Sequence, residues 1–252
     1  MVSSDTPLSR TVLDRLMLAY GAAADPADAG PMRAYMRDAF PFLGIKTPRR
    51  RQLAKQIVRG LPAPDQQDLR AVALACWAQP AREYQYFAVD WLVKHANRPE
   101  PGFLGTIETL VTTRSWWDTV DPLATRVVGP IVARQTASLA REASPGGPGK
   151  PPTAVSTMDD WAADDNLWLA RTALLHQLHY KEKTDTGRLF GYCAALAGHP
   201  DFFIRKAIGW ALRQYARTDP GAVRTFVAAT PTLSGLSVRE AMKHLAGPPA
   251  AG

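Results

Sequence analysis

The chain has 252 residues, of which 46% are hydrophobic and 21% charged, and its formal net charge is +7. With 8 Phe, 7 Tyr and 7 Trp it can bury a large apolar core, which excludes a chain that is disordered as a whole. No apolar run reaches the roughly 18 residues of a membrane span, and Met1–Arg10 lacks a signal-peptide core, so we expect a cytoplasmic protein.

Apolar residues recur mostly at spacings of three and four between clusters of Pro, Gly and Asp, a pattern typical of helices. Few windows alternate strictly or gather the β-branched residues of strands. The sequence therefore predicts an all-α protein. We expect helices over residues 9–22, 29–40, 47–59, 66–78, 81–96, 102–112, 115–141, 156–163, 166–180, 184–197, 201–216, 219–229 and 237–246.

A weak internal repeat indicates how these helices are arranged. The segment 165–173 aligns with 201–207 once a two-residue slip is allowed, which places Arg171 and Arg205 34 residues apart. This period is typical of helical solenoids, and an Asp followed by an Arg resembles the second helix of a HEAT-type repeat. We predict a right-handed α-solenoid of about six HEAT-like helical hairpin repeats.

The helical pattern is interrupted once, by residues 143–156, which contain four Pro and three Gly. Because neither a helix nor a strand continues through such a segment, we expect a flexible insertion, either a functional lid or a tolerated surface loop. The pattern resumes after it in the same style, which indicates one HEAT-like domain over residues 7–246. Residues 1–6 and 247–252 are expected to be disordered.

The predicted helix over 202–217 carries a large aromatic side chain on its polar side. Trp210 lies opposite the apolar arc, a position suited to a surface that meets bases, sugars and phosphates, although it could also pack under a neighbouring repeat. Gly209 fits the close approach of a backbone or a ligand. The cations that share this side are Lys206, Arg213 and Arg217.

Arg171 falls on the apolar arc of its predicted helix. A buried guanidinium needs an anionic partner. That partner could be a ligand, or an Asp through which repeats are tied together, as Arg205 could also do.

The segment Ser115–Asp121 (SWWDTVD) holds the third unusual cluster. Ser115 and Asp118 have the spacing of a capping box. Trp117 and Asp121 are four residues apart at the edge of a buried stripe, where an indole beside a carboxylate can hold a cationic centre. Alternatively, Asp121 caps a new helix that starts at Pro122.

Together these segments resemble the AlkD family of bacterial alkylpurine DNA glycosylases, which are built from HEAT-like repeats with a concave DNA-binding face. SWWDTVD and KAIGWALR are the most specific of the shared motifs. The motifs, in the family's order, lie at residues 35–50, 115–121, 165–183, 203–213 and 236–244.

The resemblance assigns roles to individual residues. It implies that Asp121, Trp117 and Trp210 are catalytic and that Arg171 and Tyr35 contact DNA. The further DNA-binding positions would be Lys46, Lys206, Arg213 and His179. Relatives often carry Lys where this chain has His179, and some carry Gln where it has Lys46, so phosphate contacts there could be weaker or rearranged.

The activity implied is that of a DNA repair glycosylase, which hydrolyses the N-glycosidic bond of cationic N3- or N7-alkylated purines in duplex DNA without flipping the base into a pocket. A bacterial, nucleoid-associated monomer is expected, with no membrane partner. The alternatives are a non-catalytic HEAT-like protein that binds branched or distorted DNA, and a HEAT-type protein-interaction scaffold.

Composition agrees with this activity. Cys76 and Cys193 are far apart and the five His are dispersed, so neither a metal nor a cofactor is expected. A net charge of +7 is by itself also an ordinary solubility charge. Its predicted distribution is more informative, because cations gather around Trp210 and at residues 49–51, where they would form one wall of a DNA groove.

Overall fold

The computed structural model describes residues 5–142 and 154–245, and every regular element in these ranges is a helix. The predicted all-α class is thereby confirmed. The chain forms two compact units, unit 1 (residues 1–106) and unit 2 (residues 107–252), and the boundary falls within helix α6 (Leu104–Thr112). No helix of the described ranges is long and apolar enough to cross a bilayer.

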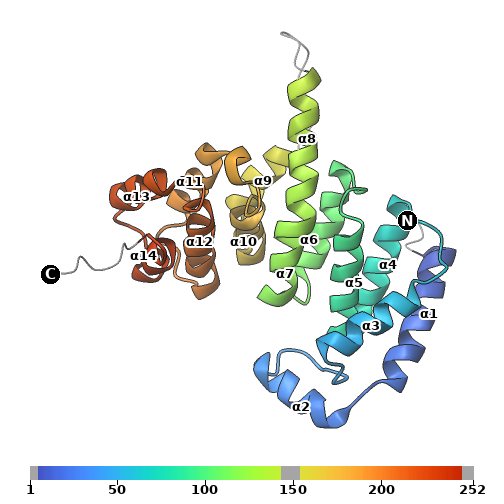
Figure 1. Ribbon diagram of the computed structural model, residues 1–252. Coiled ribbons are helices and arrows are strands. Elements are labelled where there is room, and N and C mark those ends of the chain that lie inside the picture. The colour runs from blue at the N-terminus through green and yellow to red at the C-terminus, as the bar shows by residue number, and fades with distance from the viewer. Residues whose placement is uncertain (1–4, 143–153, 246–252) are drawn as a thin grey trace. The chain divides into compact units, whose positions relative to one another are not determined.

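Unit 1 is built on α1, α4 and α5, which lie side by side (Figure 1). Leu16, Tyr20, Leu69 and Leu92 are fully buried in its core. Its helices are α1 (Pro7–Ala22), α2 (Pro26–Tyr35), α3 (Thr47–Ile57), α4 (Gln66–Ala78), α5 (Arg82–Lys94) and the 3-10 turn η1 (Pro101–Phe103).

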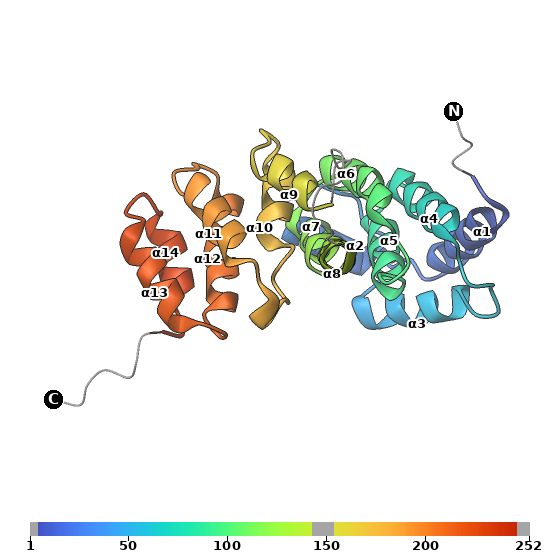
Figure 2. The same cartoon turned by 90° about the horizontal axis from the view of Figure 1, so that it is seen from above.

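Unit 2 is a row of packed helices in which α10 contacts α12 and α12 contacts α14 (Figures 1 and 2). This succession is the helical-repeat arrangement predicted from the sequence. The elements of the unit are α7 (Trp117–Leu123), the π-helix η2 (Ala124–Val128), α8 (Gly129–Glu142), α9 (Ala154–Ala162), α10 (Leu167–Leu175), the 3-10 turn η3 (Lys181–Lys183), α11 (Thr186–Ala195), α12 (Phe202–Tyr215), α13 (Pro220–Ala229) and α14 (Gly235–Met242).

Side-chain caps explain why many of these helices begin where they do. A cap accepts a hydrogen bond from a backbone N–H that has no partner inside the helix. Thr6 and Asp65 form full capping boxes at the starts of α1 and α4. The other side-chain caps are Asp25, Asn166, Asp185, Asp201, Asp219 and Ser234.

Several expected boundaries were wrong. Asp5 and Thr6 are placed, and Thr6 caps α1, so this end of the segment 1–6 is ordered. Residues 154–156 belong to α9 and not to the predicted insertion. The remainder of that insertion and residues 247–252 lie outside the described residues, and the single domain over 7–246 stays a prediction.

Gly209 is the point at which α12 and α14 meet most closely. A Cβ added at Gly209 would lie 2.5 Å from the Cβ of Glu240 and 3.0 Å from the carbonyl oxygen of Ser237. The Ser237 hydroxyl donates to the carbonyl of Arg205 at 2.9 Å, so the two helices are also joined by a partly buried hydrogen bond. Position 209 therefore needs a glycine because α14 packs against it, which is the close approach of a backbone that the sequence indicated.

Replacing Gly209 by Ala tests this contact. Ala favours a helix over Gly by roughly 1 kcal/mol, but the added methyl overlaps α14, which costs about 1–3 kcal/mol. We expect Gly209→Ala to lower the Tm in thermal unfolding by several degrees. Gly191→Ala on α11, where the added Cβ meets nothing within 4 Å, should leave the Tm unchanged or raise it. Equal effects of the two variants would contradict the packing argument.

Candidate active site

The SWWDTVD segment forms the start of α7, and its backbone departs from the regular helix within two turns. Trp116 is the N-cap residue, and Ser115 donates to the carbonyl of Val111, so the predicted capping box was wrong. Pro122 lies inside the helix, which also excludes the alternative in which Asp121 caps a new helix at that proline. Because proline has no N–H, the bond that residue 122 would donate one turn back is missing.

The chain then passes through the π-helix at 124–128 before α8 begins. Thr125 donates to the carbonyl of Asp121 at 2.8 Å, which ties the start of the π-helix to the candidate catalytic residue. A Cβ on Gly129 would lie 2.4 Å from the carbonyl oxygen of His176 at the end of α10. The π-helix itself packs against α10, and Gly129 lets the start of α8 pass close to the end of that helix. Single π-turns of this kind often lie at functional sites.

Asp121 and Arg171 form a two-point ion pair between α7 and α10. Arg171 Nε lies 2.7 Å from Asp121 Oδ1 and Nη2 lies 2.8 Å from Oδ2, while Nη1 donates to the backbone carbonyl of Phe203 on α12. The Arg171 side chain is 4% exposed and that of Asp121 is 13% exposed. The planar guanidinium therefore fixes the orientation of a carboxylate that is still accessible from outside.

Two opposing effects act on the Asp121 carboxyl. Burial is the larger and raises the pKa of Asp121 above its ordinary value, because the charged form loses water. The hydrogen bonds and positive charge of Arg171 lower this pKa, and the nearby Asp118 raises it further. Pairing with Arg171 is thus the interaction that favours the anionic form of Asp121.

The sequence left two partners open for Arg171, a ligand or an Asp that ties repeats together. The guanidinium ties two helices together through an Asp, and that Asp is the candidate catalytic residue itself. A phosphate contact by Arg171 stays a prediction, because in the structure all three guanidinium nitrogens donate to Asp121 and Phe203. Arg205, aligned with it in the repeat, is half-buried and donates weakly to the carbonyl of Asp201.

Phe203 links this pair to a group of aromatic side chains. Trp117 and Trp210 are both half-buried, so Trp210 is less open than its helical position indicated. Phe203 lies 5.1 Å from the rings of Trp116 and Trp168, and the Arg171 guanidinium is 6.0 Å from the centre of the Phe203 ring.

Sequence reasoning missed the ring cluster of Trp116, Trp168 and Phe203 as a feature of the site. Each residue belongs to a different segment, so a helical wheel drawn for one helix at a time does not bring them together. The available signal was that each lies inside one of the resemblance motifs, within three residues of a residue that was singled out. Phe202, half exposed beside Phe203, extends the cluster toward solvent.

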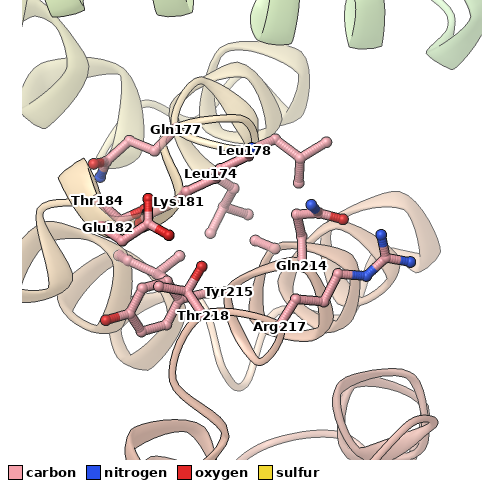
Figure 3. A pocket seen from close by; sticks show the side chains of 12 residues that line it. Leu174, Gln177, Leu178, Lys181, Glu182, Thr184, Gln214, Tyr215, Arg217 and Thr218 are labelled. Carbon is pink, nitrogen blue, oxygen red and sulfur yellow. Dashed lines mark hydrogen bonds between the residues drawn. The ribbon is translucent and has the colours of Figure 1, made fainter.

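Two of the three cations predicted to share the Trp210 side of α12 pair with a carboxylate. Lys206 Nζ lies 2.6 Å from Glu240 Oε1, and Arg213 Nη1 pairs with Glu240 Oε2. Arg217 lies past the end of α12 and lines a separate cavity of about 220 Å³ together with Lys181 and Gln214 (Figure 3). A single carboxylate on α14 thus takes up two of the three predicted cations.

This cavity is separate from the Asp121–Arg171 pair, although both involve residues of α10 and α12. Its lining includes Leu178, just past α10, and Gln214 near the end of α12 (Figure 3). The Arg171 contact involves Phe203, at the start of α12. The two features therefore occupy opposite ends of α12.

His179 is exposed and lies at a hollow of about 580 Å³ beside α8. Tyr180 donates to the carbonyl of Gly129 at 2.6 Å and holds this turn against α8. His176, at the inner wall, has its pKa lowered to about 4 by burial and is neutral at pH 7. Of the two histidines, only His179 is placed for contact with a large ligand.

The remaining predicted DNA contacts belong to unit 1. Tyr35 ends α2 and is 74% exposed. Lys46 also faces solvent, but its ammonium lies 2.8 Å from Asp28, a contact that raises the pKa of Lys46. Arg50 is buried and paired with Asp90 at 2.7 Å, so of the basic cluster expected at residues 49–51 only Arg49 and Arg51 face solvent.

A buried carboxylate holds the loop between Tyr35 and Lys46. Glu83 accepts backbone N–H bonds from Leu43, Gly44 and Ile45 at 2.9–3.1 Å. Gly44 has φ of +88°, and a Cβ there would lie 2.0 Å from the carbonyl oxygen of Asp25, so only glycine fits. This loop belongs to the first resemblance motif.

The described residues contain no cluster of three or more His, Cys, Asp or Glu side chains able to hold a metal ion. Cys76 and Cys193 are buried free thiols whose pKa values are raised by burial, which makes them poor nucleophiles.

Comparison with known proteins places this geometry in a family. The family model described as DNA alkylation repair enzyme matches residues 16–245. The chain belongs to this family. A solved structure described as a predicted DNA alkylation repair enzyme from Enterococcus faecalis is 31% identical and has a TM-score of 0.77, over 89% of this chain and 98% of that one. No curated protein matches the chain.

Membership of the DNA alkylation repair enzyme family establishes the broad role of the protein. It is a DNA repair enzyme, and this role implies that it binds DNA. The residues of the Asp121 site lie within the matched range, as do Tyr35 and Lys46 of unit 1.

Removing one partner of the buried pair should cost stability. In Arg171→Leu the Asp121 carboxylate keeps its charge but loses its partner, and breaking such a pair costs about 3–5 kcal/mol. We expect a large fall in unfolding free energy in urea at pH 7. Because the missing guanidinium lets the pKa of Asp121 rise further, the carboxyl is protonated more readily and the deficit should shrink as the pH falls toward 4. A deficit independent of pH would contradict an anionic Asp121.

Proposed function

We propose that the protein is a DNA glycosylase that removes cationic N3- or N7-alkylated purines from duplex DNA by hydrolysing the N-glycosidic bond. The observation that carries this proposal is an accessible carboxylate, Asp121, held by a buried Arg171 whose guanidinium lies 6.0 Å from the centre of the Phe203 ring, which itself contacts the Trp116 indole. Membership of the DNA alkylation repair enzyme family supports the substrate class.

The chemistry of the substrate explains why so few groups suffice. An alkylated N3 or N7 already carries positive charge, so the base leaves without being protonated by the enzyme. The transition state is an oxocarbenium-like deoxyribose, as in glycoside hydrolysis generally. What the protein must supply is negative potential at the sugar and an oriented water molecule.

Asp121 can supply both. Each carboxylate oxygen accepts more than one hydrogen bond, so the Arg171 contacts leave acceptor capacity for a water molecule. In a site shielded from solvent, the anion stabilises developing positive charge more strongly than it would in water. Trp117 and Trp210 would present electron-rich faces to the same charge.

Arg171 would then act through Asp121. Its guanidinium orients the carboxylate and favours its anionic form, and it is itself held by the carbonyl of Phe203. In this proposal Arg171 is a positioning residue. The proposed enzyme works without a metal or cofactor, acts as a monomer in the bacterial cytoplasm, and does not need to flip the base into a pocket.

The Asp121→Asn variant tests the proposal directly. The amide keeps the shape of the side chain but removes the negative charge, so we expect release of 7-methylguanine from methylated duplex DNA to be lost, while DNA affinity stays close to that of the wild type. Asp118→Asn, on the same helix, is the matched control and should retain excision. Undiminished excision by Asp121→Asn would refute the mechanism, and DNA binding by a wild type that releases no base would support a non-catalytic DNA-binding protein.

The pH dependence of excision should report the pKa of Asp121. Activity requires the anion, so it falls as the pH drops through this raised pKa. Arg171→Gln removes the interactions that lower the pKa and should shift the acid limb of kcat/KM to higher pH. Single-turnover rates from about pH 4.5 to 8, corrected for spontaneous base loss, measure the shift. A slower enzyme with an unshifted limb would indicate that Arg171 acts elsewhere, for example on a phosphate.

A further inference from the structure

Glu240 on α14 joins two cations that flank Trp210. Lys206 lies four residues before Trp210 and Arg213 three residues after it, so all three share one face of α12. Each oxygen of the Glu240 carboxylate pairs with one cation, Oε1 with Lys206 at 2.6 Å and Oε2 with Arg213.

The packing of α14 on α12 determines the position of Glu240. Gly209 has no side chain, and the Cβ of Glu240 occupies the space that a Cβ at Gly209 would take. One turn before Glu240, the hydrogen bond from the Ser237 hydroxyl to the carbonyl of Arg205 holds α14 against α12. The Glu240 side chain is 16% exposed, and those of Arg213 and Lys206 are 23% and 41% exposed, so solvent screens the Arg213 contact less than the Lys206 contact.

This arrangement changes what the α12 face offers to DNA. Two cations with one carboxylate between them carry a net charge of one, and both ammonium and guanidinium are already hydrogen-bonded. A DNA phosphate would have to displace Glu240 to make the contacts that it now makes. The carboxylate thus competes directly with phosphate oxygens for the same donors.

We propose that Glu240 is a positioning residue that holds Lys206 and Arg213 beside Trp210 and weakens their attraction for the phosphates of undamaged DNA. The inference rests on the proposed function for its ligand, since it takes duplex DNA as the molecule that meets the Trp210 face. It makes Glu240 a determinant of specificity, because it lowers the general electrostatic attraction without touching Asp121.

The salt dependence of binding distinguishes this role from a purely structural one. Each phosphate contact adds about 0.9 to the slope of log K against log salt concentration. In Glu240→Gln both cations become free for phosphates, so the slope for an undamaged duplex should steepen by about one to two. At about 0.1 M salt the affinity should rise roughly tenfold for each additional phosphate that the protein neutralises.

Two controls accompany this variant. Asp160→Asn, on the exposed surface of α9, makes the same change in net charge away from Trp210 and should leave the slope near the wild-type value. Glu240→Asp keeps the carboxylate and should restore most of the wild-type behaviour. An unchanged slope in a folded Glu240→Gln protein would overturn the inference, as would an equal change in Asp160→Asn.

A second variant keeps the inference testable if Glu240→Gln does not fold. Because Glu240 already offsets part of the charge of Lys206 and Arg213, the double variant Lys206→Gln/Arg213→Gln should lose clearly less than the slope of about two that two free cations would contribute. Loss of that slope would overturn the inference. Release of 7-methylguanine by the wild type, measured in the same preparations, tests the proposed function separately, so the failure of either one is recognised.

Discussion

The buried pairing of Asp121 with Arg171 is the interaction on which the arrangement of the site depends. It joins α7 to α10, and through the carbonyl of Phe203 it reaches α12, so one guanidinium connects three helices. Desolvation opposes the charge on Asp121, and Arg171 offsets it. The same contact therefore contributes both to helix packing and to the anion that the proposed chemistry needs.

A buried ion pair usually adds little net stability, because the attraction between its members mainly repays the loss of water. Here the pair instead fixes the position and orientation of the Asp121 carboxylate. The fork of Arg171 fixes the orientation of the carboxylate, and Thr125 of the π-helix holds the backbone carbonyl of Asp121. A more regular helix with an apolar pair at these positions would pack well without presenting an anion.

Several other cations of the protein are also paired with carboxylates. Glu240 takes up Lys206 and Arg213, Asp28 takes up Lys46, and Asp90 takes up Arg50. A net charge of +7 therefore does not appear as an open basic patch at any of these positions. A DNA phosphate that meets one of these cations would compete with a carboxylate of the protein for the same donors.

Apolar periodicity by itself determined that the chain is helical and located most helices, because burial of one face requires a spacing of three to four residues. It also singled out Trp210, Asp121 and Arg171 as residues on unexpected faces. It could not determine which charges stay free, because the partner of a side chain lies on another helix: Glu240 is 27 residues beyond Arg213, and Asp121 is 50 residues before Arg171. Only the packing of α14 on α12 and of α7 on α10 decided these pairs.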